Sequence, residues 1–292
     1  MKTAFYIFMM SVLVLAASPL RAGSMAVAQE FDVEYTYEGG GTTVQNDRRA
    51  GSVTEHDALV RYVWSPQLNK DTLLRVGAEW ERFTFTAPSG VAVPSALQEA
   101  DIVVGLDYQV ADKWLVRGEA MPGFYGDFKS ATWRNANMPL MLGGVYLANA
   151  DLQWMFGVWI NPRSELPIMP GFGVRWKLNN EWTLNLQAPR PRVEYNVNDN
   201  LQLYFGGEVK FVTCAVNNHF GTQCGLPQLN NATVDFTEAR VGPGVSWKIL
   251  PTLSLEVNGG YVLGRWWNFY EQNIRLESRP APYGQIACRV RF

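Results

Sequence analysis

The sequence predicts an all-β protein: a single antiparallel, up-and-down transmembrane barrel of about 14 strands, with about 12 to 16 as the range. Three observations predict this fold. Apolar residues alternate with polar or charged ones, short connections alternate with long ones, and tryptophan recurs beside the short connections. A secreted β-sandwich or a soluble barrel shares the alternation, but it buries its apolar face and lacks aromatic bands at its ends.

The alternation is clearest between residues 201 and 212. Leu203 and Phe205 share one face of the expected strand, whereas Glu208 and Lys210 share the other. The same split recurs in residues 101–110 and 253–263. A strand in a membrane barrel turns one face to lipid and the other to a polar interior, so a repeated apolar and charged alternation favours a barrel.

The expected connections fall into two classes that alternate along the chain. The short turns are rich in Asn, Asp and Pro, which tolerate turn geometry, and are expected at 65–71, 111–112, 149–150, 179–180, 198–200 and 250–251. The long connections are expected at 39–53, 86–97, 126–138, 161–166, 214–233 and 265–280, with one tight turn at 188–191 on the same side. Short periplasmic turns and longer external loops are typical of a transmembrane barrel with both termini in the periplasm.

Tryptophan marks one rim of this expected barrel. Amphipathic rings settle at the headgroup level of a lipid bilayer, so tryptophans beside successive short turns predict an aromatic girdle. The girdle residues are Trp64, Trp114, Trp154, Trp176, Trp182 and Trp247.

The N-terminus predicts a signal peptide over residues 1–28. Lys2 precedes an apolar run at 4–17, and small residues follow. Cleavage after Ala22 or after Ala28 fits, and Ala28 is preferred because residues 31–38 already resemble a strand. No other segment approaches the roughly 20 apolar residues of a helical span. The barrel domain is therefore expected over 29–292, where 23 basic and 27 acidic residues argue against nucleic-acid binding.

The last eleven residues, 282–292, end in an aromatic residue with apolar residues at every second position. This segment resembles the C-terminal strand of bacterial outer-membrane β-barrel proteins. The resemblance implies that the barrel-assembly machinery recognises Phe292. The segment Trp182–Tyr195 is also similar to an uncharacterised domain-of-unknown-function family of outer-membrane barrels, which implies a location in outer-membrane lipid but no particular activity.

The lumen is expected to carry both signs of charge. About 8 strands leave a filled interior and 16 or more leave an aqueous channel, so about 14 strands allow a narrow passage or one partly closed by a loop. Charges of both signs favour ion pairs that brace the wall. A local basic patch would favour anionic solutes, unless acids of the opposite wall neutralise it. The candidates for a constriction are Arg175, Lys177, Arg190, Arg192, Glu194, Glu208 and Lys210.

Cysteine placement adds one expectation. Cys214 and Cys224 fall in the longest expected external loop, where an oxidising compartment favours a disulfide, although two free thiols are the alternative. His219 lies between them, but a fourth metal ligand is not evident. We expect no metal, cofactor or catalytic residue.

These features favour a passive pore or small-solute channel. The alternative is a non-conducting barrel that acts through its external loops, either as a structural element or on a surface partner. A third hypothesis is a lipid-modifying barrel enzyme, which would require His56 or His219 to activate a serine.

Overall fold

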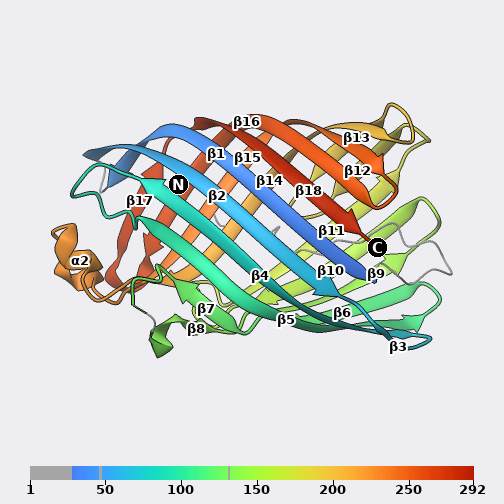
Figure 1. The fold of residues 1–292 in the computed structure, drawn as a ribbon, viewed down its shortest axis with the longest axis horizontal. Coiled ribbons are helices and arrows are strands. Elements are labelled where there is room, and N and C mark those ends of the chain that lie inside the picture. The colour runs from blue at the N-terminus through green and yellow to red at the C-terminus, as the bar shows by residue number, and fades with distance from the viewer. Residues whose placement is uncertain (1–27, 46–47, 131) are drawn as a thin grey trace.

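The computed structural model describes residues 28–45, 48–130 and 132–292, and within them the chain forms one closed β-sheet (Figure 1). Its segments combine into an antiparallel barrel of 14 strands, which β1 and β18 close by pairing along their length. The structure confirms the predicted fold class and the strand number. The predicted signal peptide and its two cleavage points lie outside the described residues, apart from Ala28, so they stay predictions.

The strands differ in length around the barrel. Seven long strands are β1 (Gln29–Gln45), β2 (Arg48–Trp64), β4 (Thr72–Thr86), β5 (Ala96–Ala111), β14 (Leu201–Ala215), β15 (Thr233–Leu250) and β16 (Leu253–Phe269). The shorter ones are β6 (Trp114–Ala120), β9 (Leu140–Leu147), β10 (Leu152–Ile160), β11 (Ile168–Lys177), β12 (Trp182–Leu186), β13 (Arg192–Asn196) and β18 (Ala281–Arg291).

Short segments complete the described structure. Four of them extend neighbouring strands: β3 (Gln67–Asn69), β7 (Gly123–Gly126), β8 (Ala136–Asn137) and β17 (Ile274–Ser278). One α-helical turn, α2 (Phe220–Gln223), and the 3-10 turns η1 (Trp133–Asn135), η2 (Pro227–Leu229) and η3 (Tyr270–Gln272) lie in connections. None of the helices in the described part of the chain is long and apolar enough to cross a membrane.

The faces of the strands carry opposite chemistry, as the alternation predicted. In β5, Ile102 and Leu106 are about half exposed on the outside of the barrel, whereas Asp101 and Asp107 are buried inside it. Soluble sheets bury the apolar face instead. The outward apolar face and the inward charged face are those of a transmembrane barrel.

The two ends of the barrel differ in their connections. The end that carries the short turns and the C-terminus, at the right of Figure 1, is called the turn end below, and the opposite end is called the loop end. Two expected loops are wrong: within 39–53, β1 continues to Gln45 and β2 begins at Arg48, and β16 and β17 occupy most of 265–280. Glycines at 39–41 suggested a loop, but Gly41 is packed closely, since an added Cβ would lie 2.6 Å from the Arg279 carbonyl oxygen.

The long strands converge at the loop end. Strand β14 pairs with β13 up to Gly206, receives two further main-chain contacts at Gly207 and Val209, and then pairs in parallel with β7 at Ala215. Strand β7 also pairs with β5, so at the loop end the wall passes from β5 through β7 directly to β14 and leaves out the short strands β9 to β13. Fewer strands make a narrower barrel at this end. The lumen is therefore widest toward the turn end.

Candidate functional site in the barrel lumen

The side chains that face the lumen change character along each long strand. On β14, Tyr204 and Glu208 lie nearest the turn end, Lys210 follows, and Val212 comes last. Polar groups thus give way to a charged layer and then to an apolar one. On β15 the same order is Arg240, Glu238, Phe236 and Val234.

The turn half of the lumen is charged and partly solvated. Six of its arginine side chains keep between 18 and 30 % of their surface exposed although they make ion pairs, whereas Arg117 keeps 12 % and Arg75 keeps 3 %. The six are Arg61, Arg175, Arg190, Arg192, Arg289 and Arg291. Arg61 bridges Glu79 and Glu119 at 2.8 and 2.9 Å, and Arg175 lies 3.9 Å from Glu194. Partial exposure of charges inside a barrel indicates a vestibule that is open to water.

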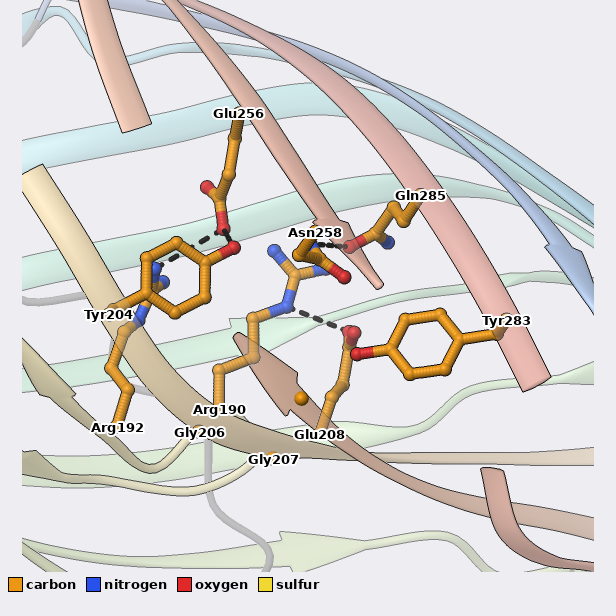
Figure 2. A pocket seen from close by; sticks show the side chains of 11 residues that line it. Arg190, Arg192, Tyr204, Gly206, Gly207, Glu208, Glu256, Asn258, Tyr283 and Gln285 are labelled. Carbon is orange, nitrogen blue, oxygen red and sulfur yellow. Dashed lines mark hydrogen bonds and ion pairs between the residues drawn. The ribbon is translucent and has the colours of Figure 1, made fainter. Parts of the chain in front are cut away.

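A pocket lies at the inner end of this vestibule (Figure 2). Arg190 reaches into it from the turn between β12 and β13, and its guanidinium contacts Glu208 at 2.7 Å and Glu34 at 2.6 Å. Arg192 contacts Glu256 at 3.2 Å, and the Tyr204 hydroxyl donates to the same carboxylate at 2.5 Å. Two aromatic rings, two arginines, two glutamates and two amides therefore converge on one space. The lining residues are Arg190, Arg192, Tyr204, Gly206, Gly207, Glu208, Gly242, Glu256, Asn258, Tyr283 and Gln285.

Beyond the pocket, ion pairs cross the lumen in a layer without solvent, called the ionic layer below. Lys210 of β14 reaches the opposite wall, where it binds Asp57 of β2 at 2.5 Å and Glu81 of β4. Such crossing contacts brace the wall, since removing one partner leaves an uncompensated buried charge. The other members of the layer, with side chains at most 1 % exposed, are Glu38, Glu55, Glu238, Arg240 and Arg265.

Apolar side chains fill the lumen at the loop end. Trp267 is fully buried there, with its ring 5.3 Å from Phe85 and 5.4 Å from Phe236. Most of these side chains belong to the wall strands, but Val91 and Val93 come from the connection 87–95, and Phe220 and Leu229 come from the connection 216–232. The group, called the loop-end cluster below, includes Val53, Phe83, Phe85, Leu97, Val212, Cys214, Val234, Phe236, Trp267, Phe269 and Leu276.

The predicted constriction residues are only partly brought together. Arg190, Arg192 and Glu208 line the pocket, Glu194 and Arg175 lie beside it on β13 and β11, and Lys210 belongs to the ionic layer. Lys177 is exposed at the end of β11 and lies outside the lining. Acids of other strands pair with these arginines, so the local basic patch is neutralised. The sequence had left open whether the patch stays basic or is neutralised by acids of the opposite wall.

The predicted disulfide is not formed. Cys214 lies in β14 instead of a loop, and its buried thiol donates to the Gln98 carbonyl oxygen at 3.6 Å. Cys224 is also a free thiol, which contacts the Gly221 carbonyl oxygen at the end of α2. The prediction failed because β14 extends further than its sequence suggested and turns Cys214 into the loop-end cluster.

The tryptophans predicted to form a girdle all lie near the turn end. Trp64, Trp114, Trp176, Trp182 and Trp247 are 42 to 50 % exposed on the outside, and Trp154 is half buried against Phe172. Their contact with lipid headgroups stays a prediction.

The surroundings of the two histidines differ from those of a histidine that activates a catalytic serine. His56 faces outward from β2, where its Nδ1 lies 2.7 Å from the Tyr35 hydroxyl and its ring packs on Tyr37. The backbone N–H of His219 donates to the Asn217 side chain just before α2. A tyrosine hydroxyl, rather than a serine, is therefore the partner of His56.

Sequence reasoning missed several groups at the centre of the site. Arg265 was placed in an external loop, yet it is fully buried and contacts Glu55 and the Val53 carbonyl oxygen. Tyr283 and Gln285 line the pocket from β18. These two residues alternate with outward-facing residues of β18, and this alternation is the sequence signal that could have identified them as lumen residues.

This geometry defines a class: a closed, up-and-down antiparallel barrel with the fold of outer-membrane β-barrel proteins. The model of the family described as Domain of unknown function (DUF6268) matches residues 67–277. The chain therefore belongs to this family. No curated protein matches the sequence.

Solved structures share the fold at low sequence identity. The crystal structure of an outer membrane channel from Pseudomonas putida F1 is similar over 94 % of this chain and 100 % of that chain, with a TM-score of 0.51 and 8 % identity. The toluene transporter TodX of P. putida is similar over 91 % of this chain and 90 % of that chain, with a TM-score of 0.44 and 9 % identity. At these identities the first likeness establishes the fold alone, and the second carries no argument.

Proposed function

We propose that the protein is an outer-membrane channel for small polar solutes, described here in a closed state. The observation that carries the proposal is the pocket at the inner end of a solvated vestibule. Hydrogen-bonding groups from several strands line it, and two arginines balance two glutamates. A balanced lining favours solutes without net charge, because neither sign of ion gains from binding.

The proposed orientation places the turn end in the periplasm. The outward apolar faces contact outer-membrane lipid, and the tryptophans near the turn end lie at the headgroup boundary. The backbone of Phe292 bonds to Gln29 and Ala28 where the barrel closes. We assign Phe292 as the signal read by the barrel-assembly machinery, so its deletion is expected to lower the amount of folded protein in the membrane.

A conductance measurement tests the channel. Refolded protein in a planar bilayer is expected to give discrete, infrequent conductance steps, since the ionic layer closes the axis at rest. Liposomes that contain the protein are expected to swell faster in small neutral solutes than in charged solutes of equal size. Folded protein that gives neither signal contradicts the proposal.

The second candidate is a non-conducting barrel that acts through its external loops. The loop-end cluster favours it, because buried apolar side chains of the wall strands and of the connections 87–95 and 216–232 fill the lumen there. Trp267→Ala distinguishes the two candidates. A channel shows steps in the wild type and larger steps in the variant, whereas a permanently closed barrel is silent in the wild type and conducts, if at all, only in the variant.

A further inference from the structure

The lumen contains an unusual ladder of carboxylates between β4 and β5. In the register of these strands, Glu79 lies directly opposite Asp101, and Glu81 lies directly opposite Glu99. All four residues occupy inward-facing positions of their strands. Like charges directly opposite each other in a sheet are destabilising. Two such pairs in succession therefore require compensation from another group.

Neighbouring cations compensate only part of this ladder. Arg61 binds Glu79 at 2.8 Å, and Lys210 binds Glu81. Among the described residues, no ion pair joins Glu99 or Asp101 to a basic side chain. On the opposite wall the situation differs, since Glu34, Glu208 and Glu256 each contact two arginines.

A buried oxygen atom of Asp101 is a second, independent observation that indicates a ligand at this place. The Asp101 side chain is only 6 % exposed, yet its Oδ1 atom has no hydrogen-bond partner. The Tyr125 hydroxyl lies beside this carboxylate, but it has one proton and also contacts the Met121 carbonyl oxygen at 2.9 Å. A buried carboxylate oxygen without a partner is costly unless a cation or a proton sits against it.

We propose that Glu79, Glu99 and Asp101 bind a divalent cation, and that calcium fits best. One oxygen from each carboxylate lies within 4.8 Å of the others. Calcium accepts six to eight oxygen ligands in a flexible geometry, whereas magnesium demands a near-ideal octahedron and gives up its waters reluctantly, so a cluster of carboxylates on two neighbouring strands suits calcium better. Three carboxylates and Arg61 leave a local charge that one divalent ion balances. Glu79 and Glu99 are only partly buried, so the ion enters from the solvated vestibule.

The test measures the thermal unfolding midpoint of refolded, lipopolysaccharide-free protein in detergent, after removal of metals with EDTA. Millimolar calcium is expected to raise the wild-type midpoint by several degrees, and magnesium is expected to raise it less. Glu99→Gln and Asp101→Asn are expected to abolish the rise. Without calcium, both variants are expected to unfold at or above the wild-type temperature, because each removes a like-charge repulsion.

Asp107→Asn is the matched control. Asp107 is also an inward carboxylate of β5, but Arg117 binds both of its oxygens at 2.6 Å, so the calcium response is expected to survive. Heat-modifiable migration on a gel verifies that each variant is folded. A wild type that does not respond to calcium, or an Asp101→Asn variant that responds fully, overturns the proposal. An equal response to magnesium overturns the assignment to calcium. No outcome depends on conductance, so the site and the channel are tested separately.

Discussion

The turn half and the loop half of the lumen are enclosed by the same long strands, yet they hold different kinds of side chain. Six arginines of the turn half keep 18 to 30 % of their side-chain surface in solvent, although Arg75 keeps only 3 %, whereas Arg240 and Arg265 beyond the pocket keep at most 1 %. Further toward the loop end, Trp267 and Phe236 exclude charge altogether. The difference shows that one barrel combines a water-filled vestibule with a packed core, and that the ionic layer is the boundary between them.

The same substitution is expected to cost more free energy of unfolding in a region without water than in a solvated one. A charge in the vestibule keeps water as an alternative partner after its ion pair is lost. A charge in the ionic layer has no water nearby to take the place of a lost partner.

Replacement of Lys210 is expected to have the largest effect. Lys210→Met leaves Asp57 and Glu81 as buried carboxylates without their shared cation, which costs about 3–5 kcal/mol. Urea unfolding in lipid vesicles, followed by tryptophan fluorescence, measures the loss. The triple variant with Asp57→Asn and Glu81→Gln is expected to recover most of the stability. A loss below about 1 kcal/mol for Lys210→Met alone means that water reaches the ionic layer.

Truncation of the loop-end cluster comes next. Trp267→Ala removes a fully buried ring and is expected to cost about 3 kcal/mol, at the lower end of the usual range if Phe85 and Phe236 move into the space. The same unfolding assay applies. Trp133→Ala is the control, since Trp133 is 86 % exposed in a connection and its loss is expected to leave stability unchanged. Equal losses for both variants contradict a packed loop half.

The sequence predicted the two halves unequally, for a physical reason. In the turn half, polar residues face inward and apolar ones outward, so alternation identified the lumen side of residues such as Glu194 and Arg192. In the loop half both Trp267 and Phe269 face inward and are apolar, which inverts the pattern. The segment that contains them was predicted to be an external loop. Pairing across the lumen, as between Lys210 and Asp57, joins residues far apart in sequence, and one sequence alone carries no signal for it.

The outside of the loop end is expected to respond to pH through Asp235. This residue lies twelve positions from Trp247 along β15, beyond the roughly 9–11 residues that cross a membrane. Its carboxylate accepts hydrogen bonds from Thr213, Ser164 and the backbone of Glu165, which hold the connection 161–167 against the barrel. Burial raises the pKa of Asp235 to about 6, although these hydrogen bonds oppose the shift.

A raised pKa means that the docked connection binds the proton more tightly than the free one. The stabilisation is complete below a pH of about 4, near the ordinary pKa of an aspartate, and is lost as the pH rises through about 6. Over the whole titration the change is about 3 kcal/mol, because each pKa unit corresponds to about 1.4 kcal/mol. Hydrogen exchange at 161–167, corrected for the intrinsic rate, is expected to be faster at pH 7 than at pH 4.5. Asp235→Asn keeps the neutral form, so it is expected to remove the difference, whereas a difference that persists in this variant assigns it to another group.

The smallest effect on stability is expected in the vestibule. Arg175 keeps 23 % of its side-chain surface exposed, and its ion pair with Glu194 spans 3.9 Å. Arg175→Ala is therefore expected to change the free energy of unfolding by less than about 1 kcal/mol. If the vestibule belongs to a conducting path, the same variant is expected to shift the reversal potential in a salt gradient toward cation selectivity, because it removes a positive charge from the wall. A loss of stability as large as that of Lys210→Met would place Arg175 in a dry region and remove the distinction between the two halves.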